Sequence, residues 1–143
     1  MKIVLELPIE PLSTNKLYGN VFGQARRFVS TEGKKFKNDV NTLVRDIIIN
    51  ENLSEHVSNM SGKALVVSME VGLPSWLLKD GKSLRRKDLD NTCKACLDSV
   101  FKCLAEFEED IDDSQIWTLN LSKKVSLTPM TIITIQLLEN TQL

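Results

Sequence analysis

Four stretches of the chain have the pattern of β-strands, in which apolar residues alternate with polar ones or β-branched residues cluster. The clearest is 63–73, where every second residue from Leu65 to Leu73 is apolar. An amino-terminal strand is expected at 3–7, because the prolines at positions 8 and 11 end it. Two further strands are expected at 115–123 and 130–138.

Two longer stretches have apolar residues at steps of three and four, which predicts amphipathic helices. The first begins near Glu32, where Ser30 or Thr31 can cap it, and ends before the polar stretch 50–62. The second runs from about Asn91 to Ala105. The apolar positions are Phe36, Val40, Leu43, Val44, Ile47 and Ile48 in the first helix, and Leu89, Cys93, Cys96, Leu97, Val100, Phe101 and Leu104 in the second.

The predicted order of elements is β-α-β-α-β-β, in a single domain that spans 1–143. About four strands in one sheet and two main helices bury their apolar faces together as a two-layer α+β sandwich. The polar connection at 12–30 is long enough to suggest a function. The stretch 50–62 carries the lone His56, which is expected to be exposed and without a ligand role.

Charge is distributed unevenly along the 143 residues, although the formal net charge is only −1. Residues 106–113 include six carboxylates and no cation, whereas residues 16–37 include six cations and one carboxylate. A basic patch can steer a polyanion even when the whole chain lacks a basic balance. No apolar run approaches the roughly 18–20 residues of a membrane span. The apolar run at the amino terminus is too short for a signal peptide. Three cysteines, an odd number, favour a reducing compartment over a disulfide framework. We therefore expect a cytoplasmic protein with no membrane association.

Chemistry-bearing side chains are most concentrated in the stretch 85–94. If the chain is extended around Asp88, the two-residue spacing places Asp88 and Asp90 on one face. Two close carboxylates repel each other unless a cation lies between them, and hard oxygen ligands favour Mg²⁺ or Mn²⁺ over zinc. The alternative is that one of these acids caps the following helix. Three cations precede the pair and indicate an anionic partner such as a phosphodiester: Arg85, Arg86 and Lys87.

A third carboxylate is expected from 112–113, where two acids precede a predicted strand. The helix from 91 to 105 is about 22 Å long at ~1.5 Å per residue, and the segment 106–113 can retrace about 25 Å at ~3.3 Å per residue. Reach therefore permits an acid at 112–113 to return to the neighbourhood of Asp90. Lys94 follows Asp90 by four residues, so it forms either a surface ion pair or a cation beside a scissile phosphate.

Two other motifs have a chemical and a packing interpretation. Cys93 and Cys96 have the Cys-x-x-Cys spacing, but they lie within a helical pattern and zinc would need the distant His56. Buried packing is the favoured interpretation for them. Trp76 is interpreted as a dimer or core contact rather than a residue that stacks on a base. Trp76 and the apolar face of 93–104 are the candidates for a dimer interface.

Taken together, the motifs resemble those of the RusA-type Holliday junction resolvases. The resemblance rests on the run from Arg86 to Asn91, on Lys94, and on the sequence Asp-Asp-Ser-Gln-Ile at 112–116. The amino-terminal half agrees at 7–8 (Leu-Pro), 13–18 (Ser-Thr-Asn-Lys-Leu-Tyr) and 29–33 (Val-Ser-Thr-Glu-Gly). The resemblance spans nearly the whole chain, with the motifs in the expected order. The acidic residues of 106–110 depart from the family, in which this turn is less charged.

This resemblance implies a homodimeric endonuclease of DNA recombination and repair that binds four-way DNA junctions and cuts two strands symmetrically, using Mg²⁺ or Mn²⁺. By position, Asp88, Asp90 and Asp113 match the family's metal-binding catalytic carboxylates, and Lys94 matches its essential lysine. Asp112 is the residue most easily confused with Asp113. The alternative function is binding of branched DNA without cleavage. The residues expected to contact DNA are Asn15, Lys16, Arg26, Arg27, Lys34, Arg85, Arg86, Lys87 and Asn91.

Overall fold

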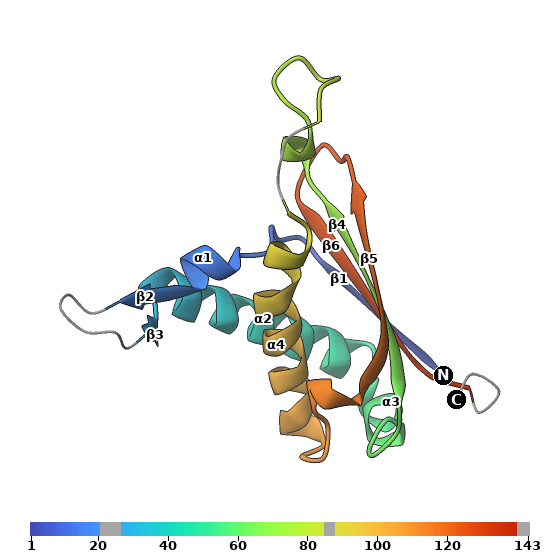
Figure 1. Cartoon of the computed structure of the whole chain (residues 1–143). Coiled ribbons are helices and arrows are strands. Elements are labelled where there is room, and N and C mark those ends of the chain that lie inside the picture. Colours follow the sequence, from blue (N-terminus) through green and yellow to red (C-terminus); the bar gives the residue numbers. More distant parts are fainter. Residues whose placement is uncertain (21–26, 85–87, 140–143) are drawn as a thin grey trace.

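A mixed four-stranded sheet with two long helices forms the frame of the protein (Figure 1). The structure is a computed structural model, and it describes residues 1–20, 27–84 and 88–139. The predicted α+β class and the order of the main elements are confirmed. These main elements are β1 (Lys2–Leu7), α2 (Thr31–Asn50), β4 (Leu65–Gly72), α4 (Asp90–Phe107), β5 (Ile116–Lys124) and β6 (Met130–Leu137).

The sheet has the strand order β1-β6-β4-β5, with β5 at one edge. β6 pairs antiparallel with β1 and β4, whereas β4 and β5 are parallel. Parallel neighbours need a crossover connection, and here α4 supplies it. β4 alternates fully buried and half-buried residues, and β1 alternates buried and exposed ones, so the helices cover one face of the sheet. The topology therefore fixes α4 against the edge of the sheet where β5 begins.

Short elements fill the two connections that the sequence pattern leaves without structure. The connection 12–30 contains α1 (Thr14–Leu17) and a two-stranded sheet of β2 (Tyr18–Asn20) and β3 (Arg27–Val29). The polar stretch 50–62 contains α3 (Ser54–Asn59). Two short 3₁₀ turns complete the fold: η1 (Pro74–Trp76) and η2 (Asp113–Gln115).

The prediction that His56 is exposed is wrong. His56 lies in α3, which is held by the buried side chains of Val57 and Met60, and it is half-buried. Its Nδ1 is buried and has no hydrogen-bond partner. Two apolar residues spaced by three are enough to pack one helical turn against the core. The polar composition of 50–62 hides this short pattern.

The core lies between the sheet and the helices α2 and α4. Buried side chains from β1, β4 and β6 meet one face of α2 and most of α4. All three cysteines are buried free thiols, which confirms the packing interpretation. Burial raises the pKa of the Cys96 thiol to about 12, so this group does not form a thiolate nucleophile near neutral pH.

Trp76 is part of this core, with 3% of its surface exposed. Its indole Nε1 donates a hydrogen bond of 2.7 Å to the carbonyl oxygen of Val71. The Lys123 ammonium lies 4.5 Å from the ring centroid, in a cation–π contact. The core interpretation of Trp76 is therefore confirmed, and a buried ring has no face left for a DNA base.

The short helix α1 is held at the start of α2 by the cap of that helix. Ser30 caps α2 as predicted: its Oγ accepts a hydrogen bond from the Gly33 amide at 2.9 Å and donates one to the Lys16 carbonyl at 2.7 Å. Leu17 packs with Ala95 of α4. Gly33 allows this approach, because a Cβ atom there would lie 2.6 Å from the Leu17 carbonyl oxygen. Among the described residues, no helix is long and apolar enough to span a membrane.

The close approach of α1 to α2 predicts that Gly33→Ala is destabilising. The added methyl group must displace the Leu17 backbone, and such overpacking costs about 1–3 kcal/mol even though alanine favours a helix. Urea denaturation followed by circular dichroism measures the free energy of unfolding. Lys35→Ala is the control, since Lys35 is exposed on the same helix. Equal stability of Gly33→Ala and the wild type would contradict this packing.

Candidate functional site

Asp88 and Asp90 flank the start of α4, and both side chains are exposed. Between them, Leu89 packs against the core, and its carbonyl accepts a hydrogen bond of 2.6 Å from the Thr92 hydroxyl. Leu89 has helical backbone angles (φ −66°, ψ −40°), so the segment is not extended at this residue. Anchoring of Leu89 nevertheless leaves both carboxylates in solvent at the amino end of a helix, where the helix dipole favours negative charge.

Asn91 contacts both acids, one through its side chain and the other through its backbone. The Asn91 amide nitrogen Nδ2 lies 3.5 Å from Asp88 Oδ2, and the Asn91 backbone N–H donates to Asp90 Oδ1 at 3.0 Å. The carboxylate groups of Asp88 and Asp90 are both exposed, so a cation or another ligand can reach them from solvent.

Lys94 lies one turn beyond Asp90 on the same face of α4, and Asp98 lies one turn beyond Lys94. Lys94 is exposed. It lines a cavity of about 400 Å³ together with Asp98, Asp112 and Asp113. The structure therefore brings two of the predicted catalytic residues, Lys94 and Asp113, to one cavity.

The turn η2 distinguishes Asp112 from Asp113. Asp112 caps this turn: its carboxylate accepts hydrogen bonds from the backbone N–H of Gln115 and from the Ser114 hydroxyl, the latter at 3.0 Å. The Gln115 side chain accepts a 2.8 Å bond from the Asp112 N–H and donates to the carbonyls of Met60 (2.7 Å) and Lys63 (2.9 Å). Asp112 thus has a structural task, and Gln115 fastens the turn that carries Asp113.

The two neighbouring acids have opposite pKa shifts. A hydrogen bond with Asp112, partial burial and a hydrogen bond with Asp98 together raise the pKa of Asp113. Hydrogen bonds from Asp113 and Ser114 lower the pKa of Asp112. Two carboxyl groups in contact share a proton more easily than they bear two charges. Asp112 is therefore the more acidic member of the pair, and a cation beside Asp113 would favour the ionised form of its carboxyl group.

Asp98 is a carboxylate of this region that the sequence reasoning missed. It follows Asp90 by eight residues, which is about 12 Å along a helix, and Asp113 lies beside it rather than at the end of α4. Within residues 1–20, 27–84 and 88–139, no three His, Cys, Asp or Glu side chains are grouped to hold a metal ion. The ligand set of Asp88, Asp90 and Asp113 stays a prediction. The four-residue spacing from Asp90 through Lys94 to Asp98 is the signal that could have found Asp98.

The residues expected to contact DNA fall into three groups. Lys16 on α1 and Lys34 on α2 are exposed, and α1 packs against the amino-terminal half of α4 through Leu17 and Ala95. Asn15 also belongs to α1, and Arg27 begins β3. Asn91 lies in the first turn of α4. Four of the predicted residues lie outside the described part of the chain: Arg26, Arg85, Arg86 and Lys87.

Comparison with protein families gives one match. The family model described as endodeoxyribonuclease RusA matches residues 8–136 of the 143. A search of curated proteins found no match. The matched region includes both ends of the candidate site, from Asp88 at the start of α4 to Asp113 in η2.

The hydrogen bonds of Gln115 predict that Gln115→Ala loosens η2. The substitution removes three hydrogen bonds, each worth about 1 kcal/mol net, so we expect the free energy of unfolding to fall by about 2–3 kcal/mol. Urea denaturation measures the change. Thr118→Ala, at an exposed position of β5, should change stability by no more than about 0.5 kcal/mol. A variant as stable as the wild type would mean that Gln115 does not hold this turn.

Proposed function

The chain belongs to the RusA family of endodeoxyribonucleases, and from this membership we propose that it resolves four-way DNA junctions by symmetric hydrolysis of two phosphodiester bonds. Family membership indicates endodeoxyribonuclease activity. The observation that carries the proposal is the match over residues 8–136, which spans the cavity shared by Lys94 and Asp113. We further propose that this activity serves DNA recombination and repair in the cytoplasm.

Mg²⁺, or Mn²⁺ in its place, is the proposed cofactor, with Asp88, Asp90 and Asp113 as its ligands. The donor chemistry fits, because carboxylates are the hard oxygen ligands of these ions and all three groups are exposed. The described residues do not group the three acids at one point, since Asp113 lies beside Asp98, about two turns of α4 beyond Asp90. Neighbouring carboxyl groups raise the pKa of Asp113, so a positive charge beside it would be favourable. When bound, the ion would lower the pKa of a water molecule and offset the charge of the phosphate.

The side chains of the chain itself have distinct tasks in this proposal. Lys94 places an ammonium group in the cavity, where it stabilises the negative charge that develops on the phosphate during hydrolysis. Asn91 orients Asp88 through its side-chain amide. The amino end of α4 adds partial positive charge near Asp88 and Asp90, which favours an anionic group there. Asp112 contributes indirectly, by capping the turn that carries Asp113.

A homodimer is part of the proposal, because two-fold symmetry would present two sites to a junction of matching symmetry. The two candidates for its interface, Trp76 and the apolar face of 93–104, are buried in the chain's own core. The edge strand β5 is the better surface. Trp117 is the extra residue of a β-bulge there and is 66% exposed, and Leu119 is 40% exposed. Exposed apolar residues on an unpaired strand edge suit a second copy of the chain.

The catalytic proposal predicts opposite outcomes for two adjacent acids. Asp113→Asn should lower junction cleavage about 100- to 1000-fold, as should Asp90→Asn, because each removes an essential charge. Asp112→Asn should retain activity within about threefold, since asparagine caps as well as aspartate. A synthetic four-way junction, incubated with Mg²⁺ and with Mn²⁺, provides the assay.

Two results would contradict this proposal. A wild-type protein that shifts the junction in a gel but leaves it intact with both ions would favour the binding-only alternative. Loss of activity in Asp112→Asn as severe as in Asp113→Asn, at equal stability, would show that the two acids are not distinguished as the structure indicates.

The dimer proposal predicts that Trp117→Glu shifts the protein towards monomer. A charge at a buried aromatic contact should raise the dimer dissociation constant at least about tenfold, which sedimentation velocity measures. Leu127→Glu is the matched control, because Leu127 is 97% exposed and lies outside the strands. A monomeric wild type, or a dimer insensitive to Trp117→Glu, would exclude β5 as the interface.

A further inference from the structure

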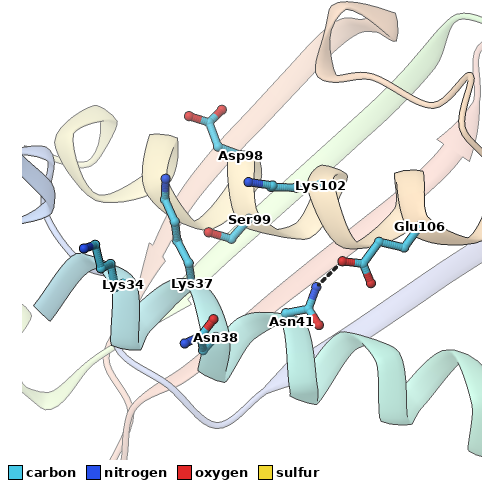
Figure 2. Close-up of a pocket in the computed structure, with 8 residues that line it drawn as sticks. All are labelled: Lys34, Lys37, Asn38, Asn41, Asp98, Ser99, Lys102 and Glu106. Atoms are coloured by element: carbon cyan, nitrogen blue, oxygen red, sulfur yellow. Dashed lines mark hydrogen bonds between the residues drawn. The ribbon is translucent and has the colours of Figure 1, made fainter. Parts of the chain in front are cut away.

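A second cavity, of about 470 Å³, lies between α2 and α4 (Figure 2). We call it the lysine groove. From α2 it is lined by Lys34, Lys37, Asn38 and Asn41, which are spaced so that they share one face of the helix. From α4 it is lined by Asp98 and Lys102, among others. Figure 2 shows Lys37 extending from α2 towards α4, and Lys102 lying along α4 with its ammonium group on the side of Lys37.

One end of the groove is closed by contacts between the helices. Glu106 of α4 accepts a hydrogen bond of 3.2 Å from Asn41 and pairs with Arg45, both on α2 (Figure 2 shows the former). The Cys103 thiol lies 3.5 Å from the Asn41 carbonyl oxygen. The helices are therefore fastened at Asn41, and the groove opens towards the lower-numbered turns of both, on the side of Lys34 and Asp98.

The groove carries more positive than negative charge, because three lysines line it against the carboxylates of Asp98 and Glu106. Within the described part of the chain, the ion pair is Arg45–Glu106, so neither Lys37 nor Lys102 takes part in one. The ammonium groups of Lys34, Lys37 and Lys102 repel each other, and an anion between them would relieve the repulsion.

The groove is continuous with the cavity of the candidate catalytic site. Asp98 and Lys102 line both cavities. Lys102 follows Lys94 by eight residues, a separation of about 12 Å along α4. A strand bound in the groove would therefore lie next to the cavity that Lys94 and Asp113 line.

The lining also restricts the kind of anion. The groove is lined by Lys, Asn, Asp, Ser and Glu, and among the described residues no aromatic side chain lines it that could stack on a base. Lysine ammonium groups and side-chain amides are the donors that proteins direct at phosphate oxygens. The sugar–phosphate backbone of a nucleic-acid strand fits these donors, and the bases attached to it would face solvent.

We propose that the lysine groove holds the sugar–phosphate backbone of a DNA strand that continues from the catalytic cavity, without regard to base sequence. This proposal rests on the proposed nuclease function, because the strand in the groove is part of the DNA substrate that the catalytic site would cut. Lys37 and Lys102 each contact a phosphate, Asn38 supplies a further donor, and Lys34 guides the strand at the open end.

The test is the salt dependence of DNA binding by Lys37→Gln/Lys102→Gln, measured by fluorescence anisotropy in the Asp90→Asn background without divalent metal. Each phosphate contact contributes about one to the slope of log K against log salt. We expect the slope to fall by about two and the affinity at low salt by at least about tenfold. Glutamine keeps most of the lysine stem, and circular dichroism verifies the fold.

The matched control is Lys35→Gln/Lys63→Gln, which removes the same net charge from exposed positions outside the groove. It should leave the slope nearly unchanged. Equal losses in both double variants would mean that only net charge matters, and an unchanged slope in the groove variant would mean that no strand occupies the groove. Either result overturns the proposal.

Two further probes separate this proposal from the proposed function. The first compares the binding of a four-way junction with that of a single strand of the same length. Binding of the single strand but not of the junction would contradict the resolvase function. The groove proposal would still be tested in that case, by the slope of the groove variant with the single strand. A wild type that binds neither DNA defeats both. Calorimetry with inorganic phosphate detects a small-anion site, and phosphate binding lost in the groove variant with an unchanged DNA slope overturns the DNA proposal.

Discussion

Burial of α4 against the sheet is the constraint on which the other features depend. Ten of its residues are buried, including Cys96, Val100 and Leu104. Because this face is committed to the core, the charged residues of α4 are confined to what remains, and they recur every fourth residue: Asp90, Lys94, Asp98, Lys102 and Glu106. This one row supplies α4's part of the candidate catalytic site, of the lysine groove and of the contact that fastens α2.

The elements around α4 bring charged groups to that row from distant parts of the sequence. The crossover from β4 to β5 returns the chain to the side of α4, where η2 places Asp113 beside Asp98. The cap of α2 at Ser30 holds α1, which packs on Ala95 next to Lys94. The acids of 106–113 also acquire separate roles: Glu106 joins the helices, Asp112 caps a turn, and Asp113 lines the cavity. The acidic run is thus not one patch.

The sequence was sufficient for the main fold because β4, α2 and α4 each have a strong hydrophobic period. It was insufficient for α1 and α3, whose few residues are helical only because Leu17, Val57 and Met60 are seated on other elements. Exposure in β5 could not be predicted either. Leu119 has the same pattern as a core residue and pairs with buried Val67, and only the limited reach of the helices over the sheet leaves it in solvent. Asp98 was missed because its four-residue spacing from Lys94 indicates only a shared helix face, and its place in the site depends on Asp113, which the fold brings beside it.

The row on α4 also fixes the angle about the helix axis between Lys94, in the candidate catalytic site, and Lys102, in the lysine groove. Steps of four residues exceed a full helical turn by about 40°, so the row turns gradually around the axis from the side of η2 towards α2. A single-residue insertion between Lys94 and Lys102 would lengthen the helix by only about 1.5 Å but rotate one lysine relative to the other by about 100°. Rotational phase, rather than length, is therefore the property of α4 on which the relative placement of Lys94 and Lys102 depends.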